Sequence, residues 1–353
     1  MKALFYHLLP FALAPGGLQI QITRTREALR ELGVEVEFLR WWDDRQHGEI
    51  LHFFGRMPTH VLQRAQEKGM KVVQADLLSA RGSRRGARLE SEKVVRRALV
   101  RLLPRSMMTA FNWQSYTLAD ACVALTPWEA HLMRTLFGAP AAKMHIVPNG
   151  VEEVFLASQP ATRGQWLVCS AAITERKRVL ELAEAAVAAR TPLWLIGKPY
   201  SEADTYGQRV LNLAKQHPQL IRYEGAIDDS AKLARIYRQA RGFVLLSFRE
   251  SLSHATLAAA ACECPLLLSD LPWARTVFGK NASYCPLDKS HSRAAVVLRR
   301  FYDAAPGLPL PPRPHSWPEV GQQVKRLYEA LMNGTMKPQE PVRPGAAPPE
   351  AFK

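Results

Sequence analysis

Short apolar runs alternate with stretches of helical periodicity along most of the chain. The apolar runs predict strands at Ala3–Leu9, Val34–Leu39, Ile50–Phe54, Lys71–Ala75, Ala121–Leu125 and His145–Val147, and then at Trp166–Ser170, Leu193–Ile196, Leu220–Tyr223, Phe243–Leu246 and Leu266–Leu268. Helices are predicted between them, at Ile20–Leu32, Thr59–Lys68, Trp128–Phe137, Val179–Arg190, Thr205–Gln216, Ser230–Gln239 and Ala255–Ala261. Because such alternation is typical of parallel sheets covered on both faces, we expect an α/β protein.

The pattern repeats in two halves, which predicts two doubly wound domains. Apolar periodicity lapses in "NGVEEVFLASQPATRGQ", so we expect one domain over residues 1–157 and a second over 158–315. A proline-rich connector precedes a last helix within 316–335. The proline-rich end, 336–353, has no periodic apolar face and is expected to be disordered.

The amino-acid composition is typical of a globular protein, and no membrane-spanning segment is expected. The 353 residues are 47% hydrophobic, but the apolar runs have the length of strands. The start, "MKALFYHLLPFALAPGG", is better interpreted as a first strand and its loop than as a signal peptide. The cysteines (Cys122, Cys169, Cys262, Cys264 and Cys285) are expected to be buried thiols in a reducing cytosol, and no metal site is expected. We therefore expect a cytoplasmic protein.

The net charge of +15 indicates an acidic partner such as a phosphate, a nucleic acid or an anionic membrane. Residues 81–105 alone contain nine Arg and Lys against two Glu. In this segment apolar positions share one predicted helical face: Val94, Val95, Ala98, Leu99, Leu102 and Leu103. Such a helix either lies on an anionic membrane surface or packs on the sheet of the first domain. Nucleic-acid binding is disfavoured because no binding module is recognisable.

Two stretches follow predicted strands and suit an anionic ligand. The sequence "PGGLQ" places Gly16 and Gly17 at a helix start, where backbone amides can approach an anion, although a plain tight turn would look the same. The sequence "TERKRV" places Arg176, Lys177 and Arg178 after the first strand of the second domain. Basic side chains at this turn suit a diphosphate, while a solvated helix start is the alternative.

A third stretch, "SFRESLSHATLAAAACECPLLLSD", places an acid between a predicted strand and an alanine-rich helix. Glu250 comes just past a very apolar strand, and Ser251 and Ser253 can cap the alanine-rich helix that follows. Capping alone would explain the serines. However, ligands in open α/β sheets bind beyond the carboxyl ends of strands, so we expect this turn to share a site with the basic turn.

These motifs resemble the retaining GT-B glycosyltransferases of family 4, from about Met1 to Met332. In the first domain the similarity rests on "PGGLQ" and on "ADACVALTPWEAHLMRTLFGAPAAKMHIVPNGVEEVF". In the second it rests on "AAITERKRVLELAEA", "LWLIGKP", "IRYEGAI" and the stretch around Glu250. The helix "SWPEVGQQVKRLYEAL" resembles the one that crosses back to the first domain. The resemblance implies two Rossmann-like domains facing across a cleft, the first on the acceptor side and the second binding a nucleotide-sugar.

The resemblance also implies roles for individual residues. Lys177 corresponds to the lysine that pairs with the donor diphosphate, with Arg176 and Arg178 beside it, and Glu250 to the acid near the donor sugar. The turn formed by Ser251, Leu252, Ser253 and His254 would hold phosphate at the helix start, and Gly16 and Gly17 would approach the donor from the first domain. Gln74 and Asp76 are the polar residues where many members have a histidine on the acceptor side.

Three positions depart from the family pattern, one of them Glu263, which stands where the signature has a glycine. The second signature glutamate is replaced by Ala258, and the arginine that usually precedes the lysine is replaced by Ala172. The alanine-rich helix is thus the family's signature helix without its second acid. In the family, that acid receives the ribose hydroxyls, so its absence is expected to weaken donor binding more than chemistry.

The resemblance implies a hexosyltransferase that moves a sugar from a nucleotide-diphosphate sugar to a glycan or lipid-linked acceptor with retention, in bacterial surface polysaccharide or glycoconjugate synthesis. No metal or other cofactor is expected. A lipid-linked acceptor would fit peripheral attachment of 81–105 at the inner face of the plasma membrane. Two alternatives stay open: a catalytically impaired GT-B protein that acts as a binding partner or regulator, and a nucleotide-sugar epimerase on the same fold.

Overall fold

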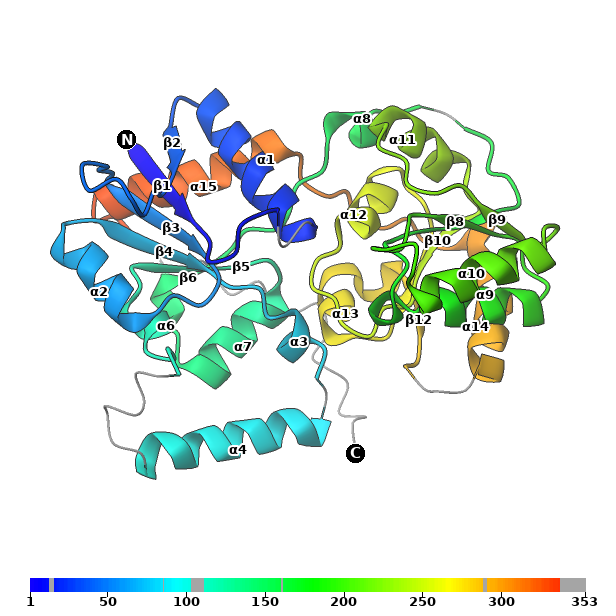
Figure 1. The fold of residues 1–353 in the computed structure, drawn as a ribbon, viewed down its shortest axis with the longest axis horizontal. Coiled ribbons are helices and arrows are strands. Elements are labelled where there is room, and N and C mark those ends of the chain that lie inside the picture. The colour runs from blue at the N-terminus through cyan, green and yellow to red at the C-terminus, as the bar shows by residue number, and fades with distance from the viewer. Residues whose placement is uncertain (13–15, 85, 103–110, 160, 288–290, 337–353) are drawn as a thin grey trace. The chain divides into compact units, whose positions relative to one another are not determined.

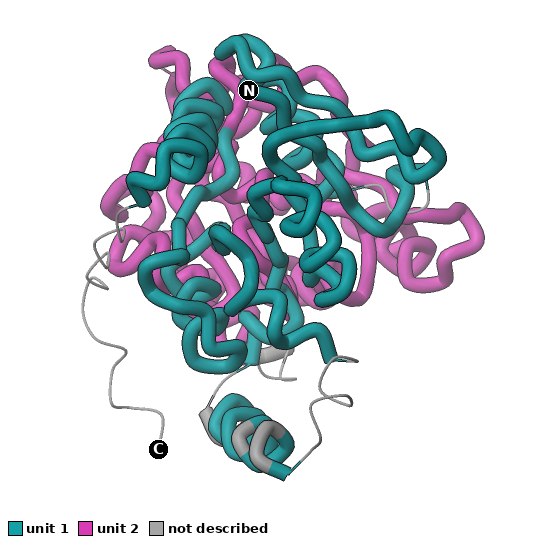
Figure 2. Tube along the Cα trace, turned by 90° about the vertical axis from the view of Figure 1, so that its left-hand side faces the viewer, with its two compact units in different colours: residues 1–150, 317–353 teal, residues 151–316 magenta. Residues whose placement is uncertain are grey.

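A computed structural model describes residues 1–12, 16–84, 86–102, 111–159, 161–287 and 291–336. The chain divides into two compact units, coloured separately in Figure 2. Unit 1 consists of Met1–Gly150 and Trp317–Lys353, and unit 2 of Val151–Ser316. The tail at 337–353, for which disorder is expected, lies outside the described residues, as do Pro15, Leu103 and Arg105.

Unit 1 is built on a six-stranded parallel sheet with the order β2-β1-β3-β4-β5-β6. Its strands are β1 (Lys2–Tyr6), β2 (Glu35–Phe38), β3 (Ile50–Phe54), β4 (Lys71–Ala75), β5 (Ala121–Ala124) and β6 (Met144–Ile146). Side chains alternate between the two faces, as strand geometry requires. In β3, Leu51 and Phe53 enter one buried cluster, and Ile50 and Phe54 enter another.

Helices cover both faces of this sheet (Figure 1). The helices of unit 1 are α1 (Gly17–Glu31), α2 (Thr59–Glu67), α3 (Ser79–Gly82), α4 (Gly86–Leu102), α6 (Ser115–Leu118), α7 (Pro127–Phe137) and α15 (Trp317–Met332), with a 3-10 turn at Ala141–Lys143. Of these, α4 lies apart from the sheet and contacts α7. The last helix, α15, packs along α1 at the other end of the sequence. A Cβ at Gly321 would lie only 2.8 Å from the Cβ of Ala28, so glycine permits this close approach.

Unit 2 has its own six-stranded parallel sheet, with the order β12-β11-β10-β7-β8-β9. Its strands are β7 (Leu167–Ser170), β8 (Leu193–Ile196), β9 (Ile221–Tyr223), β10 (Gly242–Leu245), β11 (Leu266–Ser269) and β12 (Ser283–Cys285). Its α-helices are α8 (Glu153–Leu156), α9 (Val179–Ala188), α10 (Thr205–Gln216), α11 (Ser230–Gln239), α12 (His254–Ala261), α13 (Pro272–Phe278) and α14 (His291–Ala304). Three further turns are 3-10: η2 (Glu175–Lys177), η3 (Gly279–Asn281) and η4 (Ala305–Gly307).

The structure differs from the sequence prediction mainly at the edges. The edge strand β12 was not predicted, because its three residues lack a run of apolar side chains. The helices α13 and α14 were also missed. In addition, β1 ends at Tyr6 rather than Leu9, and the side chains of Leu8 and Leu9 are exposed. The apolar character of these two residues therefore does not reflect burial in the sheet.

Candidate functional site

The strand order of unit 2 singles out one point of its sheet. The chain runs outward from β7 through β8 to β9, and then returns to place β10 on the other side of β7. In doubly wound sheets, ligands bind beyond the carboxyl ends of the strands at such a reversal. The loops that follow β7 and β10 are therefore the segments of unit 2 best placed to bind a ligand.

The loop after β7 ends in the turn η2 and then enters α9. Arg178, between η2 and α9, has a φ of 55°, in the left-handed region that side chains other than glycine seldom adopt. Its side chain is buried, and its guanidinium carbon lies 4.7 Å from the centre of the Phe248 ring. Arg178 thus packs against the loop that follows β10, whereas the neighbouring Arg176 is exposed.

Hydrogen bonds and ion pairs join these two loops. The Phe248 amide donates to the Arg176 carbonyl at 2.9 Å, and Nη1 of Arg176 donates to the Arg249 carbonyl at 2.8 Å. The ammonium group of Lys177 forms an ion pair with Oε2 of Glu250. Nη1 of Arg176 lies 3.5 Å from the same oxygen. The structure therefore brings three predicted site residues, Arg176, Lys177 and Glu250, together at the reversal point.

The pair of Lys177 and Glu250 is largely withdrawn from solvent. The side chains are 13% and 14% exposed. Removing two charges from water is costly unless each has a partner, so the pairing stabilises both in this position. An ammonium group of this kind can meet a phosphate oxygen, and a carboxylate beside it can accept hydrogen bonds from sugar hydroxyls.

The alanine-rich helix α12 begins directly after this pair. Ser253 is its N-cap, with its hydroxyl oxygen 3.5 Å from the Thr256 amide nitrogen, and the side chains of Ser251 and Leu252 are buried just before it. The first turn, which starts at His254, points backbone N–H groups toward the loop, as every helix start does.

Small side chains let α12 pack closely within unit 2. Ala259 and Ala260 are almost fully buried, and α12 contacts α8, α11, β10 and β11. Ala258 keeps 7% of its surface exposed. The alanine-rich composition is thus explained by close packing, and Ala258 is buried with its neighbours.

The glycines of "PGGLQ" lie in unit 1. Gly16 is the N-cap residue of α1 and has a φ of 144°, which only glycine adopts without strain. A Cβ there would meet no atom within 4 Å, so the backbone conformation, and not crowding, is what requires glycine. Gly17 is the first residue of α1. The prediction of a helix start at this place is confirmed, while a donor contact stays a prediction.

Gln74 and Asp76 both have protein partners in unit 1. Gln74 is buried in β4, and its side-chain oxygen accepts from the Met57 amide at 3.2 Å. Asp76, just beyond β4, accepts a hydrogen bond from the Tyr116 hydroxyl and lies 3.5 Å from Nη2 of Arg56. Asp76 is therefore part of a polar cluster at the carboxyl end of the sheet, whereas Gln74 braces the loop after β3.

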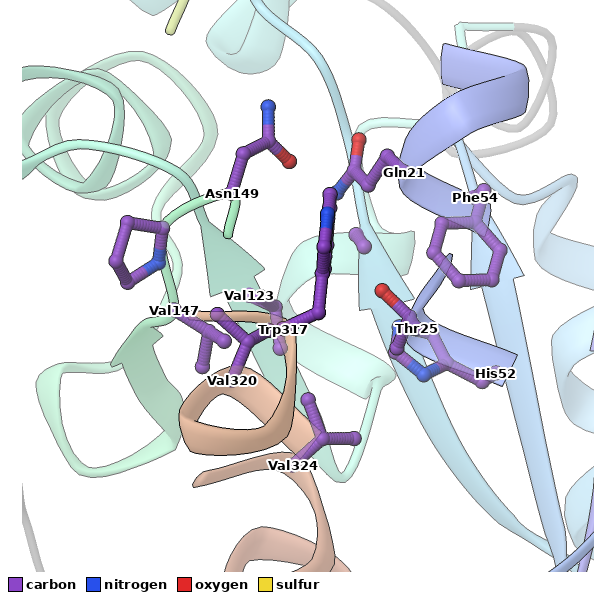
Figure 3. Close-up of a pocket in the computed structure, with 12 residues that line it drawn as sticks. Gln21, Thr25, His52, Phe54, Val123, Val147, Asn149, Trp317, Val320 and Val324 are labelled. Carbon is purple, nitrogen blue, oxygen red and sulfur yellow. The ribbon is translucent and has the colours of Figure 1, made fainter. Parts of the chain in front are cut away.

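A small cavity in unit 1 lies among α1, α15 and the sheet (Figure 3). Its volume of 10 Å³ has room for about one water molecule. Gln21, Thr25 and His52 contribute polar atoms to its wall, and Trp317 covers it. Nδ1 of His52 is 2.6 Å from the Tyr328 hydroxyl, and burial lowers the pKa of His52 from 6.5 to about 3. This cavity is too small for a sugar, and it holds a neutral imidazole in the core.

Within the described ranges, no group of three or more His, Cys, Asp and Glu side chains is arranged to hold a metal ion. The described helices also include none that is both long and apolar enough to cross a membrane. All five cysteines are buried and free.

Part of unit 2 is similar to a known protein family. Residues 164–302 match the family model "Glycosyl transferases group 1". The finding supports a group 1 glycosyltransferase. Among curated proteins, none matches this sequence.

Solved structures match both units of the chain. Sucrose-phosphate synthase from Thermosynechococcus elongatus is 16% identical, with a TM-score of 0.64 over 94% of this chain and 99% of that one. The Anabaena protein HepE, solved in complex with UDP, is 12% identical, with a TM-score of 0.60 over 94% of this chain and 100% of that one. A glycosyltransferase from Rickettsia africae is 10% identical, with a TM-score of 0.64 over 94% and 98%. The predicted α/β fold of the GT-B type is confirmed, and the structure has two parallel six-stranded sheets.

The sequence interpretation missed one group of residues in unit 1. Arg56 follows β3 and contacts Tyr116 and Asp76, and Arg96 reaches the same region from α4. Arg56 is a single basic residue after a strand, and Arg96 is one of the nine basic residues of the segment 81–105. The one available signal was the position of Arg56 just beyond a fully buried strand.

Proposed function

We propose that the protein transfers a sugar from a nucleoside-diphosphate sugar to an acceptor hydroxyl, with the donor bound at the reversal point of unit 2. One observation carries the proposal: Lys177 and Glu250 meet from the loops after β7 and β10, inside the region that matches the family model. Solved neighbours with UDP, with UDP and glucose, and with UDP-glucose support a nucleoside-diphosphate donor.

The proposed reaction breaks the bond between the sugar C1 and the diphosphate oxygen and forms a bond from C1 to the acceptor oxygen. The acceptor oxygen attacks C1 on the face from which the diphosphate departs, and its proton passes to that diphosphate, so the configuration at C1 is retained. Lys177 stabilises the negative charge that grows on the diphosphate, and the start of α12 adds backbone N–H groups. Glu250 orients the donor sugar and holds Lys177 in position. The protein thus contributes mainly positioning and charge stabilisation.

A second candidate function is donor binding without transfer. It is favoured by Ala258 and Ala172, which stand where the resemblance implies a glutamate and an arginine. A binding-only protein would take up a nucleoside-diphosphate sugar at the same site but would not release its nucleotide.

For the acceptor, we propose a glycan or lipid-linked molecule of surface polysaccharide synthesis, reached at an anionic membrane surface. The support comes from α4, where the side chains of Val94, Val95 and Leu102 are 62%, 56% and 80% exposed. These three do not pack on the sheet, so the packing interpretation of the segment 81–105 is wrong for them. Exposed apolar side chains on a basic helix favour contact with an anionic lipid surface.

The test of transfer begins with a thermal-shift screen of nucleoside diphosphates and their sugars. A ligand at a hundred times its Kd adds about 2.7 kcal/mol to the free energy of unfolding. The stabilising donors are then incubated with the protein and followed by ³¹P NMR. Release of nucleoside diphosphate supports a transferase, stabilisation without release supports the binding-only function, and no stabilisation by any donor would overturn both.

The test of membrane contact is sedimentation with vesicles at low salt. We expect the protein to sediment with anionic but not with neutral vesicles, and the variant Val94→Gln/Val95→Gln/Leu102→Gln to stay in the supernatant. The control is Val296→Gln on α14 of unit 2, whose side chain is similarly exposed. If the parent protein ignores anionic vesicles, the proposed surface is wrong.

A further inference from the structure

Unit 1 has its own reversal point, and an arginine stands beside it. The sheet order places β3 next to β1, with β2 on the far side of β1. Arg56 lies just beyond β3, and its Nε is 3.2 Å from the Tyr116 hydroxyl oxygen. A ligand of unit 1 is expected at this carboxyl end of the sheet.

Three guanidinium groups gather around one aromatic ring near this point. Their central carbons lie 4.4 Å (Arg56), 4.9 Å (Arg96) and 5.4 Å (Arg81) from the centre of the Phe137 ring. Tyr116 stacks on Phe137 at 4.5 Å with an interplanar angle of 8°, so it covers one face of the ring. We call Arg56, Arg81 and Arg96 the unit 1 arginine cluster.

Protein carboxylates compensate this cluster only in part. Asp76 pairs with Arg56, and Glu92 pairs with Arg81 at 2.8 Å. Arg96 has no hydrogen-bond or ion-pair partner among the residues that the structure describes, and its Nε is buried. Burial, followed by the charge of Arg56 and then that of Arg81, lowers the pKa of Arg96 from 12.5 to about 10. Among the described residues, the charge of Glu92 offsets this only in part, so the cluster keeps an electrostatic cost.

We propose that the unit 1 arginine cluster binds a phosphate group of the acceptor. Guanidinium groups donate paired hydrogen bonds to phosphate oxygens, and a phosphate has enough oxygens and charge to engage several of them at once. A carboxylate would engage fewer guanidinium groups. Naming the ligand an acceptor rests on the proposed transfer function, whereas phosphate binding by the cluster stands on the contacts in unit 1.

The same phosphate could belong to a lipid headgroup or to a soluble sugar phosphate. Arg96 of the cluster belongs to α4, which contacts α7 and also carries the exposed side chains of Val94, Val95 and Leu102. A lipid phosphate would therefore be bound together with contact between α4 and the membrane. A soluble phosphate would be bound without vesicles.

The experiment titrates inorganic pyrophosphate into the Lys177→Ala protein by calorimetry, so that the donor site does not add a second phosphate site. Adding Arg96→Gln should weaken binding at least tenfold, which corresponds to about 1.4 kcal/mol. The matched control is Arg64→Gln on α2, because Arg64 is exposed and pairs with Glu67. We expect the control to bind as the parent does.

Folding and binding are separated by melting curves without phosphate. Arg96→Gln removes a crowded charge and should melt at the parent temperature or above it. If this variant fails to fold, Arg81→Gln carries the same test. A second experiment replaces pyrophosphate by vesicles of neutral lipid with or without phosphatidic acid. If the protein binds the vesicles with phosphatidic acid more tightly than it binds soluble pyrophosphate, the phosphate belongs to a lipid.

Pyrophosphate affinity that is unchanged in folded Arg96→Gln and Arg81→Gln would overturn the proposal. That result would leave the transfer function standing, because donor binding is measured separately in protein with an intact Lys177. Conversely, loss of donor binding in Lys177→Ala together with retained pyrophosphate binding would support two independent anion sites.

Discussion

The reversal points of the two sheets are built alike but charged differently. In unit 2, Lys177 meets Glu250, and each charge has a partner before any ligand arrives. In unit 1, the arginine cluster gathers around Phe137, and Arg96 forms no ion pair or hydrogen bond among the described residues. The same parallel-sheet architecture therefore holds two different charge arrangements. An ion pair with no net charge is suited to positioning a ligand, whereas a cluster with excess positive charge is suited to binding an anion.

The largest effect is expected from removing the acid of the balanced pair. Glu250→Gln keeps the shape of the side chain but leaves Lys177 without its anion, so turnover should fall on the order of 100-fold. Nucleoside-diphosphate release from the donor found in the screen measures this. Glu202→Gln, at an exposed position of unit 2, is the control. If Glu250→Gln leaves turnover unchanged, the role given to the Lys177–Glu250 pair is wrong.

Acid should destabilise unit 1 through His52. The unfolded imidazole binds a proton below pH 6.5, but the buried one does so only near pH 3. The stability gained by keeping His52 neutral is therefore present above pH 6.5 and is lost as pH falls from 6.5 toward 3. The slope approaches about 1.4 kcal/mol per pH unit.

Calorimetric melting between pH 7 and pH 4 tests this expectation. His52→Phe keeps the stacking on Phe54 and should flatten the pH dependence, although its melting temperature at pH 7 falls because the contact with Tyr328 is lost. His60→Phe, at an exposed position on α2, should keep the slope of the parent. An equally steep slope in His52→Phe would show that other groups govern the acid sensitivity.

The smallest effect is expected from restoring the missing acid. Ala258→Glu supplies the carboxylate that the family resemblance places near the ribose, and we expect donor binding to tighten about fivefold. Ala261→Glu on the same helix is the control, and melting temperatures show whether α12 tolerates the larger side chain. Donor affinity unchanged in a folded Ala258→Glu protein would mean that the site serves another ligand.

Periodic patterns predicted the fold because most strands of both sheets are buried runs with clear ends. The exceptions have physical causes. The edge strand β12 has only three residues, and Leu8 and Leu9 are apolar without being buried. In unit 2, the pairing of Lys177 with Glu250 could be anticipated, because residues after neighbouring parallel strands meet at one edge of the sheet.

Contacts made by long side chains could not be predicted in this way. Arg178 lies in the same basic turn as Lys177, yet it turns back to pack on Phe248. Arg96 belongs to the basic segment 81–105, and its guanidinium lies over the rings of Phe137 and Trp113 in unit 1. Sequence spacing gives the position of a side chain on its element, whereas the direction of a long side chain depends on tertiary packing.

The most direct test of the account compares two lysines of unit 2 by calorimetric titration with the nucleoside diphosphate found in the screen. Lys177→Ala should weaken binding on the order of 100-fold, because a charged partner of the diphosphate is lost. Lys215→Ala, at an exposed position on α10, should bind as the parent does. The melting temperature of each variant without ligand shows that the fold is kept. Equal affinity of Lys177→Ala and the parent would contradict the assignment of the donor site.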